Sequence, residues 1–444
     1  MMNTATGLVQ KFEELLEPLY PADQPGAAII VVRDGDVLFR KGYGMANLEL
    51  GVSIEPHMVF RLGSITKQFT AVCILMLMEQ GKLSLQDDLA RFLPDYPTGG
   101  RTITIEHLLT HTSGIKSYTD MPEWLPLWRR DMAVDEIIDL FKDQPFEFEP
   151  GENFKYNNSG YILLGAIIEK TSGMKYAEFV QKNIFEPLRM IHSLYDETER
   201  IVPGRVAGYS KGTDGFVNAA YVSMSQPYAA GSLASSVDDL ALWEAALNAN
   251  KLLRRETLAL AFKPGMLNNG VETGYGYGWL VFEHEGFQFI QHNGGIHGFT
   301  ANGVRVPAEK VYVAVLTNSD APETPPSTVA SKLAALAIGH PIVEPEHIEL
   351  FEDALDEYVA VYQISENEER MITRQGTQMY SQRNGGVRIE IYPIAIDTFS
   401  VNKTTDRFVF TRNENGKING MQVLRRLGPP ERYLRTEKPL KKTN

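Results

Sequence analysis

The pattern of apolar and polar positions predicts a long helix directly after Gly63. Apolar residues recur there at intervals of three and four positions, which is the spacing of one face of a helix. These apolar positions are Ile65, Phe69, Val72, Cys73, Met76 and Leu77. Gly63 can supply a tight turn before the helix, and Gly81 lies where the pattern ends. Ser64 is therefore expected at the start of this helix.

Strand patterns open and close the first part of the chain, whereas helical patterns fill its middle. The runs 27–33 and 37–43 flank Asp34-Gly35-Asp36, which is typical of an antiparallel hairpin. Further strands are predicted at 277–282, 287–291, 303–306 and 311–317. Helices are predicted at 7–17, 105–109, 161–172, 237–247 and 327–338. This order predicts an α+β fold, in which one antiparallel sheet is assembled from both ends, flanked by helices, and interrupted by an inserted helical subdomain.

The composition changes between residues 341 and 357, where seven acidic residues occur without a lysine or arginine. Because domain boundaries fall in exposed polar linkers, we predict a first domain over 1–343 and a second over 344–444. The second domain carries short strand patterns separated by turn signals. They lie at 369–373, 378–382, 387–392, 398–402, 408–411 and 420–424. This pattern predicts a small all-β barrel or sandwich.

The composition is that of a globular chain without a membrane span. The 444 residues are 43% hydrophobic, which is enough for a large core and more than one domain. The longest unbroken apolar run, 71–78, is far shorter than the roughly 20 residues that a bilayer span needs. Residues 1–20 lack the residue order of a signal peptide, so a cytoplasmic location is expected. Cys73 is the only cysteine, which excludes an internal disulfide and favours a buried core thiol.

The charge balance argues against a nucleic-acid partner. The formal net charge is −13, whereas a nucleic-acid-binding surface needs a basic stripe. The one basic cluster, at Lys438, Lys441 and Lys442, is more typical of a solvated terminus.

Ser64 and Lys67 form the first candidate for chemistry. On a helix, side chains at i and i+3 share a face, so the Lys67 amine can lie beside the Ser64 hydroxyl. A serine needs a neighbour that takes its proton, and a lysine can do so if burial lowers its pKa. The helix start adds free N–H groups that suit a developing oxyanion. By itself S-x-x-K is also typical of a helix cap followed by a solvated lysine.

Two further motifs follow in order, Tyr156-Asn157-Asn158 and His292-Asn293-Gly294-Gly295. Penicillin-recognising serine hydrolases carry S-x-x-K, then Y-x-N, then K-T-G or H-x-G, and this chain resembles them. The segments FRLGSITKQFTA, ITIEHLLTHTSGI, YNNSGYILLG, AAGSLASSVDDLALW and YGYGWLV are similar to the class C β-lactamase-like family. That family includes D-Ala-D-Ala carboxypeptidases, D-aminopeptidases and family-eight esterases. The resemblance covers about residues 8–338, and the tail resembles the lipocalin-like β domain of some of these hydrolases.

The resemblance implies roles for the motif residues. Ser64 would be the nucleophile, Lys67 its proton acceptor and Tyr156 a second acid or base. Which of Lys67 and Tyr156 is the general base stays open. Asn158 would hold Lys67 and a substrate amide. The N–H groups of Ser64 and Gly295 would form the oxyanion hole, where small residues such as Gly294 and Gly295 let the backbone approach the acyl group closely.

The third motif departs from that of most β-lactamases, because His292 stands where they usually have lysine. A neutral imidazole is a weaker partner for a substrate carboxylate than a fixed ammonium. This substitution favours esters, amides or short peptides over β-lactams, and by resemblance D-amino-acid peptides fit well. A structural, hydrogen-bonded histidine is the alternative interpretation.

Several other patterns have ordinary explanations. The G-x-S-x-G at 208–212 lacks the following helix of a nucleophile elbow and predicts a plain turn. His107 and His111 have helical spacing, yet no third metal ligand is evident, so structural roles are favoured. Trp124 and Trp128 could form a substrate lid or part of the core. The role of the C-terminal domain stays open between ligand binding, gating, assembly and packing.

The sequence thus predicts a serine hydrolase that works through an acyl-enzyme on ester or amide bonds, without a metal or organic cofactor. Its expected partner is a small-molecule or short-peptide substrate, and oligomers are compatible with the sequence. A β-lactamase or penicillin-binding carboxypeptidase is the first alternative. A non-catalytic binding or assembly protein on the same fold is the second.

Overall fold

The computed structural model describes residues 2–343, 345–365, 368–384, 386–401, 406–424 and 431–440. The chain divides into two compact units, Met1–Ile342 and Val343–Asn444. Within the described ranges, no helix is long and apolar enough to cross a membrane. The cytoplasmic location stays a prediction.

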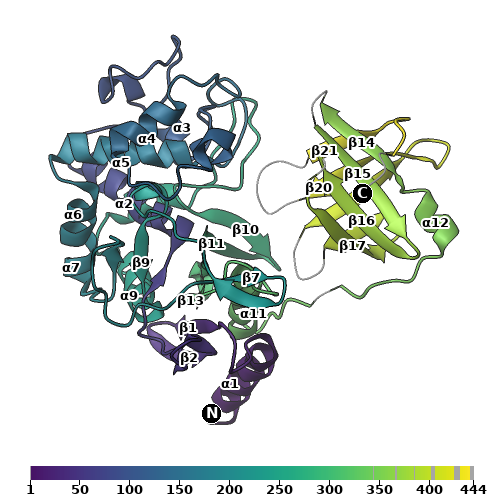
Figure 1. Cartoon of the computed structure of the whole chain (residues 1–444), viewed down its shortest axis with the longest axis horizontal. Coiled ribbons are helices and arrows are strands. Elements are labelled where there is room, and N and C mark those ends of the chain that lie inside the picture. The colour runs from purple at the N-terminus through teal and green to yellow at the C-terminus, as the bar shows by residue number, and fades with distance from the viewer. Residues whose placement is uncertain are drawn as a thin grey trace. The chain divides into compact units, whose positions relative to one another are not determined.

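A six-stranded antiparallel sheet forms the centre of the first unit (Figure 1). Its strands in spatial order are β10 (Leu280–His284), β11 (Phe287–Ile296), β12 (Phe299–Val306), β13 (Val311–Thr317), β1 (Ala27–Arg33) and β2 (Asp36–Tyr43). Strand β1 pairs with β13 from Ala27 opposite Thr317 to Arg33 opposite Val311. The early hairpin therefore joins the late strands, which confirms the prediction of one antiparallel sheet built from both ends.

The first strand of the late group begins later than predicted. A strand was expected over 277–282, whereas β10 starts at Leu280. Gly278 has a φ of +83°, and the N–H of Gly276 bonds to the carbonyl of Trp279. This tight turn uses the backbone groups that would otherwise continue the strand.

Both faces of the sheet are covered, as the alternation along β1 shows. Ala28 and Ile30 belong to the apolar cluster that contains the helical subdomain. Ala27, Ile29 and Val31 belong to a second cluster formed with α1 (Met2–Leu16) and α11 (Pro326–Ala337). Because side chains alternate across a strand, an unbroken apolar run such as this one can only be buried between two helical layers.

Helices and short turns connect the two groups of strands. They are α2 (Thr66–Glu79), α3 (Ile105–Leu109), α4 (Val134–Phe141), α5 (Asn158–Ser172), α6 (Tyr176–Val180), α7 (Glu186–Leu188), α8 (Tyr228–Gly231), α9 (Val237–Asn248) and α10 (Arg255–Ala261). Helix α2 is buried on all sides over most of its length, and Phe69 stacks on Trp243 of α9 with ring centroids 4.2 Å apart. Cys73 is fully buried in α2, and burial raises the pKa of its thiol.

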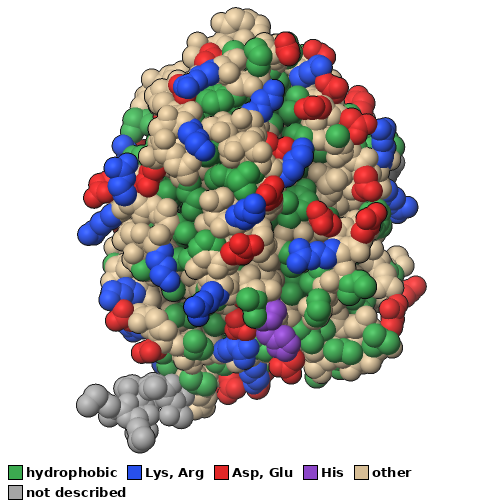
Figure 2. Space-filling model, turned by 90° about the vertical axis from the view of Figure 1, so that its left-hand side faces the viewer, with side chains coloured by type: hydrophobic (Ala, Val, Ile, Leu, Met, Phe, Trp, Pro, Cys, Tyr) green, Lys and Arg blue, Asp and Glu red, His purple; other side chains and the backbone are tan. Residues whose placement is uncertain are grey.

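Short antiparallel strand pairs link separate segments of the helical region. Strand β5 (Phe60–Arg61) pairs with β9 (Leu233–Ser235), which also pairs with β6 (Leu194–Tyr195). The remaining short strands are β3 (Met45–Asn47), β4 (Val52–Ser53), β7 (Tyr209–Gly212) and β8 (Gly215–Asn218). On the face in Figure 2, basic and acidic side chains are interspersed and form no basic stripe.

The second unit is a closed eight-stranded antiparallel barrel preceded by α12 (Glu352–Asp356). Its strands are β14 (Ala360–Ser365), β15 (Glu368–Gln375), β16 (Gln378–Arg383), β17 (Arg388–Ala395), β18 (Thr398–Val401), β19 (Arg407–Arg412), β20 (Ile418–Leu424) and β21 (Glu431–Arg435). Strands β14 and β21, which pair at Tyr362 and Arg435, were not predicted. The small all-β barrel itself is confirmed.

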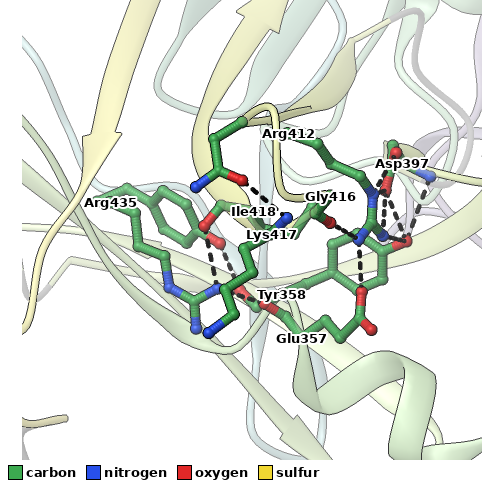
Figure 3. A network of polar contacts seen from close by, with 10 residues as sticks. Glu357, Tyr358, Asp397, Arg412, Gly416, Lys417, Ile418 and Arg435 are labelled. Carbon is green, nitrogen blue, oxygen red and sulfur yellow. Dashed lines mark hydrogen bonds and ion pairs between the residues drawn. The ribbon is translucent and has the colours of Figure 1, made fainter.

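The barrel interior is a packed core. The rings of Phe410, Tyr358 and Phe399 pack against one another, with centroids 4.8, 4.9 and 5.3 Å apart. At one end, Arg412 donates to Glu357 at 2.7 Å and to Asp397 at 2.8 Å (Figure 3). This network ties α12 and the turns around it to the last strands, because the guanidinium presents several donors in one plane.

Candidate active site

Ser64 lies in a short 3-10 turn (Gly63–Ile65) that leads directly into α2. Gly63 has a φ of +51°, and a Cβ at this position would lie 2.8 Å from the backbone nitrogen of Gly295. Only glycine combines this backbone conformation with this close approach. The turn therefore presses the start of α2 against β11 and places two of the predicted motifs together.

Lys67 is buried one turn after Ser64, with a relative exposure of 0%. Its Nζ lies 3.1 Å from the Ser64 Oγ, 2.8 Å from the Asn158 Oδ1 and 2.9 Å from the Ala230 carbonyl oxygen. All three partners are uncharged oxygens, so they do not offset the loss of solvation of an ammonium. Burial consequently holds the pKa of Lys67 well below its ordinary value.

Asn158 begins α5, whose N-terminus is capped by Asn157. The Asn157 side chain accepts a hydrogen bond from the N–H of Gly160 at 2.8 Å. The Asn158 Nδ2 donates to the Thr119 Oγ1 at 3.0 Å. This bond orients the amide so that its oxygen faces Lys67, and it explains why an amide serves here better than a carboxylate.

Tyr156 lies over the same amine, with its ring centroid 4.8 Å from the Lys67 Nζ. Its hydroxyl is buried and makes no hydrogen bond within the part of the chain that the structure describes. Burial raises the pKa of Tyr156, and an interaction with the Ser64 hydroxyl partly opposes that rise. A phenol in this environment keeps its proton at neutral pH.

The two glycines of the third motif have different reasons to be glycine. A Cβ at Gly294 would lie 1.8 Å from the Leu62 carbonyl oxygen, so any side chain there would collide with the turn before Ser64. A Cβ at Gly295 would meet nothing within 4 Å. The close approach expected at both positions is therefore found at Gly294, whereas Gly295 faces open space.

That space is a cavity of about 160 Å³. Ser64, Asn158 and Gly295 line it, whereas Lys67 and Tyr156 are not among its lining residues. The remaining lining residues are Gly63, Tyr118, Thr119, Trp124, Val222, Pro227, Ala230, Gly231, Ile296 and His297. The sequence analysis did not identify Tyr118, Thr119 or His297.

Trp124, which had been weighed between a lid and the core, is half-buried in the cavity wall. Its Nε1 donates to the Gln226 Oε1 at 2.6 Å. The indole thereby presents part of its surface to the cavity while its polar atom is fixed by the protein. Trp128 does not line this cavity and packs edge-on against His297, with ring centroids 4.5 Å apart.

His292 lies behind the cavity, with a relative exposure of 1%. Its Nδ1–H donates to the Asn293 carbonyl at 2.6 Å, and its Nε2 accepts from the Tyr275 hydroxyl at 2.8 Å. Burial, and then the nearby Lys67, lower the pKa of His292 to about 3. Both nitrogens are therefore occupied in a neutral ring, which fits the structural interpretation better than a substrate contact.

His107 and His111 also have structural partners. The His107 Nδ1 accepts from the N–H of Thr104 at 3.2 Å, and the His111 Nδ1 accepts from the N–H of Asn157 at 3.1 Å. Among the residues that the structure describes, no group of three potential ligands could hold a metal ion. Ser210 of the G-x-S-x-G pattern lies in hairpin strand β7 and donates to Asp320 at 2.6 Å.

This arrangement agrees with a comparison to known proteins. The family model described as Beta-lactamase matches residues 9–337. The chain belongs to the β-lactamase family. As a member of this family, the chain is an enzyme of the serine hydrolase class.

Three relatives of this family member show the extent of the similarity. Penicillin-binding protein 4* of Bacillus subtilis (strain 168) is 28% identical over 91% of this chain and 94% of its own length. The D-aminopeptidase of Gluconobacter oxydans (strain 621H) is 29% identical over 72% of this chain, which spans 60% of that relative. The octameric penicillin-binding protein homologue from Pyrococcus abyssi is 27% identical, with a TM-score of 0.67 over 98% of this chain and 100% of that structure.

Proposed function

We propose that this protein hydrolyses ester or amide bonds through an acyl-enzyme on Ser64. The observation that carries the proposal is the environment of Lys67. A neutral amine has two N–H donors and one lone pair. The Asn158 side-chain oxygen and the Ala230 carbonyl can only accept, so they take the two donors and leave the lone pair for the Ser64 hydroxyl. Lys67 is then the proton acceptor of the pair.

In the first half of the reaction, the Ser64 Oγ forms a bond to the substrate carbonyl carbon as its proton moves to the Lys67 Nζ. The carbonyl oxygen becomes an oxyanion, which the N–H groups of Ser64 and Gly295 would stabilise. When the tetrahedral intermediate collapses, the bond to the leaving group breaks. The leaving group takes a proton from Tyr156, and the proton held by Lys67 restores the phenol.

In the second half, water attacks the ester on Ser64 and the proton transfers run in reverse. The raised pKa of Tyr156 supports its role as the acid that protonates the leaving group, because a phenol that keeps its proton is a poor base at neutral pH. This division of roles assigns the general base of the acylation step to Lys67.

Esters, amides and short peptides, including those with D-amino acids, are the substrates that we propose. A neutral His292 with both nitrogens engaged supplies no fixed positive charge at the third motif, where β-lactamases usually have lysine. The similarity to a D-aminopeptidase supports this class. The similarity to a penicillin-binding protein keeps a carboxypeptidase or β-lactamase as the second candidate.

The test is intact-mass spectrometry after incubation with a fluorophosphonate. We expect one adduct on the wild type, none on Ser64→Ala, and an undiminished adduct on Ser210→Ala. Ser210 is the matched control, because it lies in a G-x-S-x-G pattern yet bonds to Asp320 on a hairpin. Absence of an adduct on the wild type would overturn the proposal that Ser64 is the nucleophile.

A substrate panel then separates the candidates. p-Nitrophenyl esters and D- and L-aminoacyl anilides represent the proposed class, and nitrocefin represents β-lactams. Nitrocefin turnover comparable with that of the esters would promote the second candidate.

We also propose that the protein assembles into oligomers, since an octameric homologue matches almost the whole chain. Light scattering after gel filtration tests this proposal.

A further inference from the structure

A second cavity of about 220 Å³ adjoins the first and shares His297 as a wall. Two arginines and one aspartate line it. The full lining is Val59, Arg61, Asp196, Arg205, Val206, Gly208, Ala219, Ala220, Tyr221, Ala234, His297 and Phe299. This cavity contains no residue of the three sequence motifs, and the proposed chemistry leaves it without a role.

The two guanidiniums share a single buried carboxylate. The Arg61 Nε donates to one oxygen of Asp196 at 2.8 Å, and the Arg205 Nη2 donates to the other at 2.6 Å. The Asp196 side chain has a relative exposure of 2%, against 19% for Arg61 and 32% for Arg205. Two positive charges against one negative charge give this cluster a net charge of +1, and all three residues line the cavity.

Both arginines have N–H donors that are not used in hydrogen bonds to the described part of the protein. Within the described part of the chain, the two Nη groups of Arg61 and the Nε and Nη1 of Arg205 have no hydrogen bond to protein. A planar guanidinium matches the two oxygens of a carboxylate. Asp196 fixes the two forks, so little side-chain entropy would be lost when an anion binds.

The cavity is rigidly connected to Ser64. Arg61 belongs to β5, which pairs with β9 through Ala234, and the turn that carries Ser64 follows directly. The dividing wall is fixed as well, because the His297 Nδ1–H donates to the Ala220 carbonyl at 3.3 Å. Asp320, a carboxylate that acts electrostatically on His297, accepts from the Gly298 N–H and the Ser210 hydroxyl.

We propose that this second cavity binds a carboxylate of the substrate while Ser64 attacks the scissile carbonyl. The preferred substrates are then esters or amides of acidic compounds, whose free carboxylate reaches past His297 to Arg61 and Arg205. The inference rests on the proposed function, since it concerns the substrate of the same site.

The kinetic test compares matched esters. The p-nitrophenyl monoester of adipic acid carries a free carboxylate on the acyl half, and the hexanoate is its neutral counterpart. In a second pair, the hexanoate ester on the phenolic oxygen of 3-hydroxybenzoic acid carries the carboxylate on the leaving half. Phenyl hexanoate is its neutral counterpart. The readout is the acid preference, which is kcat/KM for the acidic ester divided by kcat/KM for the neutral one.

We expect an acid preference above one in one of the two pairs. Arg205→Gln should lower that preference about tenfold. Arg205→Lys should lower it less, because lysine keeps the positive charge but lacks the planar guanidinium. Arg91→Gln is the matched control, since Arg91 is an exposed arginine paired with Asp87. It should leave the acid preference at the wild-type value. A preference of one or below in both pairs, or one equally lowered by the control, would overturn the proposal.

A binding measurement separates this inference from the proposed function. Addition of adipate should raise the thermal unfolding midpoint of the Ser64→Ala variant. In the double variant Ser64→Ala with Arg205→Gln, most of that rise should be lost. If no ester is hydrolysed by the wild type, the acyl-enzyme proposal fails, and the adipate titration alone decides on the carboxylate site. An equal rise in both variants would overturn the site.

Discussion

Two basic side chains in this molecule, Lys67 beside Ser64 and Arg412 at the end of the barrel, lie in opposite environments. Lys67 is fully buried among uncharged oxygens, and desolvation lowers its pKa. Arg412 is partly exposed and bonds to the carboxylates of Asp397 and Glu357, which raise its pKa. The difference shows that partner charge and solvent, more than the presence of a basic side chain, set whether a group holds its proton or releases it.

The comparison also separates two uses of a polar network. Around Arg412 the network is charged, exposed to salt and water, and holds turns together. Around Lys67 the network is neutral and buried, which suits proton transfer but costs the fold part of its stability. Four experiments test the contrast.

The largest effect is expected from replacing the neutral buried amine with a permanently charged group. Lys67→Arg places a group that does not release its proton at the position of the proposed base. We expect kcat/KM for esters to fall by about a thousandfold or more. Arg412→Lys, the corresponding exchange in the barrel, should change kcat/KM by less than about twofold. Steady-state kinetics with a p-nitrophenyl ester measures both, and a Lys67→Arg enzyme of near wild-type activity would contradict the role of Lys67.

The next effect comes from giving Lys67 a charged partner like those of Arg412. Asn158→Asp keeps the shape of the side chain and places a carboxylate within hydrogen-bond distance of the Lys67 amine. The pKa of Lys67 should rise, so kcat/KM at pH 7 should fall by about a hundredfold and recover partly at alkaline pH. An unchanged pH profile in this variant would show that the charge of Lys67 does not limit the reaction.

The pH dependence of the wild type follows from the same pKa. Activity should be present at neutral pH and lost as the pH falls through the lowered pKa of Lys67, because the amine then becomes protonated. Between that pKa and the ordinary value of 10.5, the unfolded chain binds more protons than the folded protein. Stability of the first unit should therefore rise with pH in this window, and denaturant unfolding at several pH values measures the slope.

The smallest effect is expected in the barrel. Arg412 lowers the pKa of Asp397 below its ordinary value of 3.8. This pair stabilises the barrel above pH 3.8, and that contribution is lost as the pH falls through the lowered pKa. Asp397→Asn should therefore weaken the hydrogen-exchange protection of β18 and β19 slightly at neutral pH and change it little in strong acid. A larger loss of protection in acid than at neutral pH would contradict this assignment.

Much of this site could be predicted from local sequence. The spacing of Ser64 and Lys67 on a helix and the order of the three motifs are local properties, and both place the right groups together. The fold followed from strand patterns at both ends of the first domain. The environment of His292 could not be predicted, because its partner Tyr275 lies on a separate turn and the bond forms only in the folded chain.

The missing elements have similar causes. Strand β14 follows directly after the acidic segment, and β21 precedes a basic tail, so their charged surroundings concealed the alternation that marks a strand. The Arg61, Asp196 and Arg205 cluster is assembled from three separate segments. In the sequence, Arg61 differs in no way from any other strand arginine, and only the folded cavity gives it a candidate partner.

The most direct test of the central claim is a titration of the lysine side chains by nuclear magnetic resonance with 13C at Cε. One resonance should titrate far below 10.5 and be absent from Lys67→Arg, and at pH 7 it should have the chemical shift of a neutral amine. If every lysine resonance of the folded protein titrates near 10.5, Lys67 is charged at neutral pH, and the account of it as the proton acceptor is wrong.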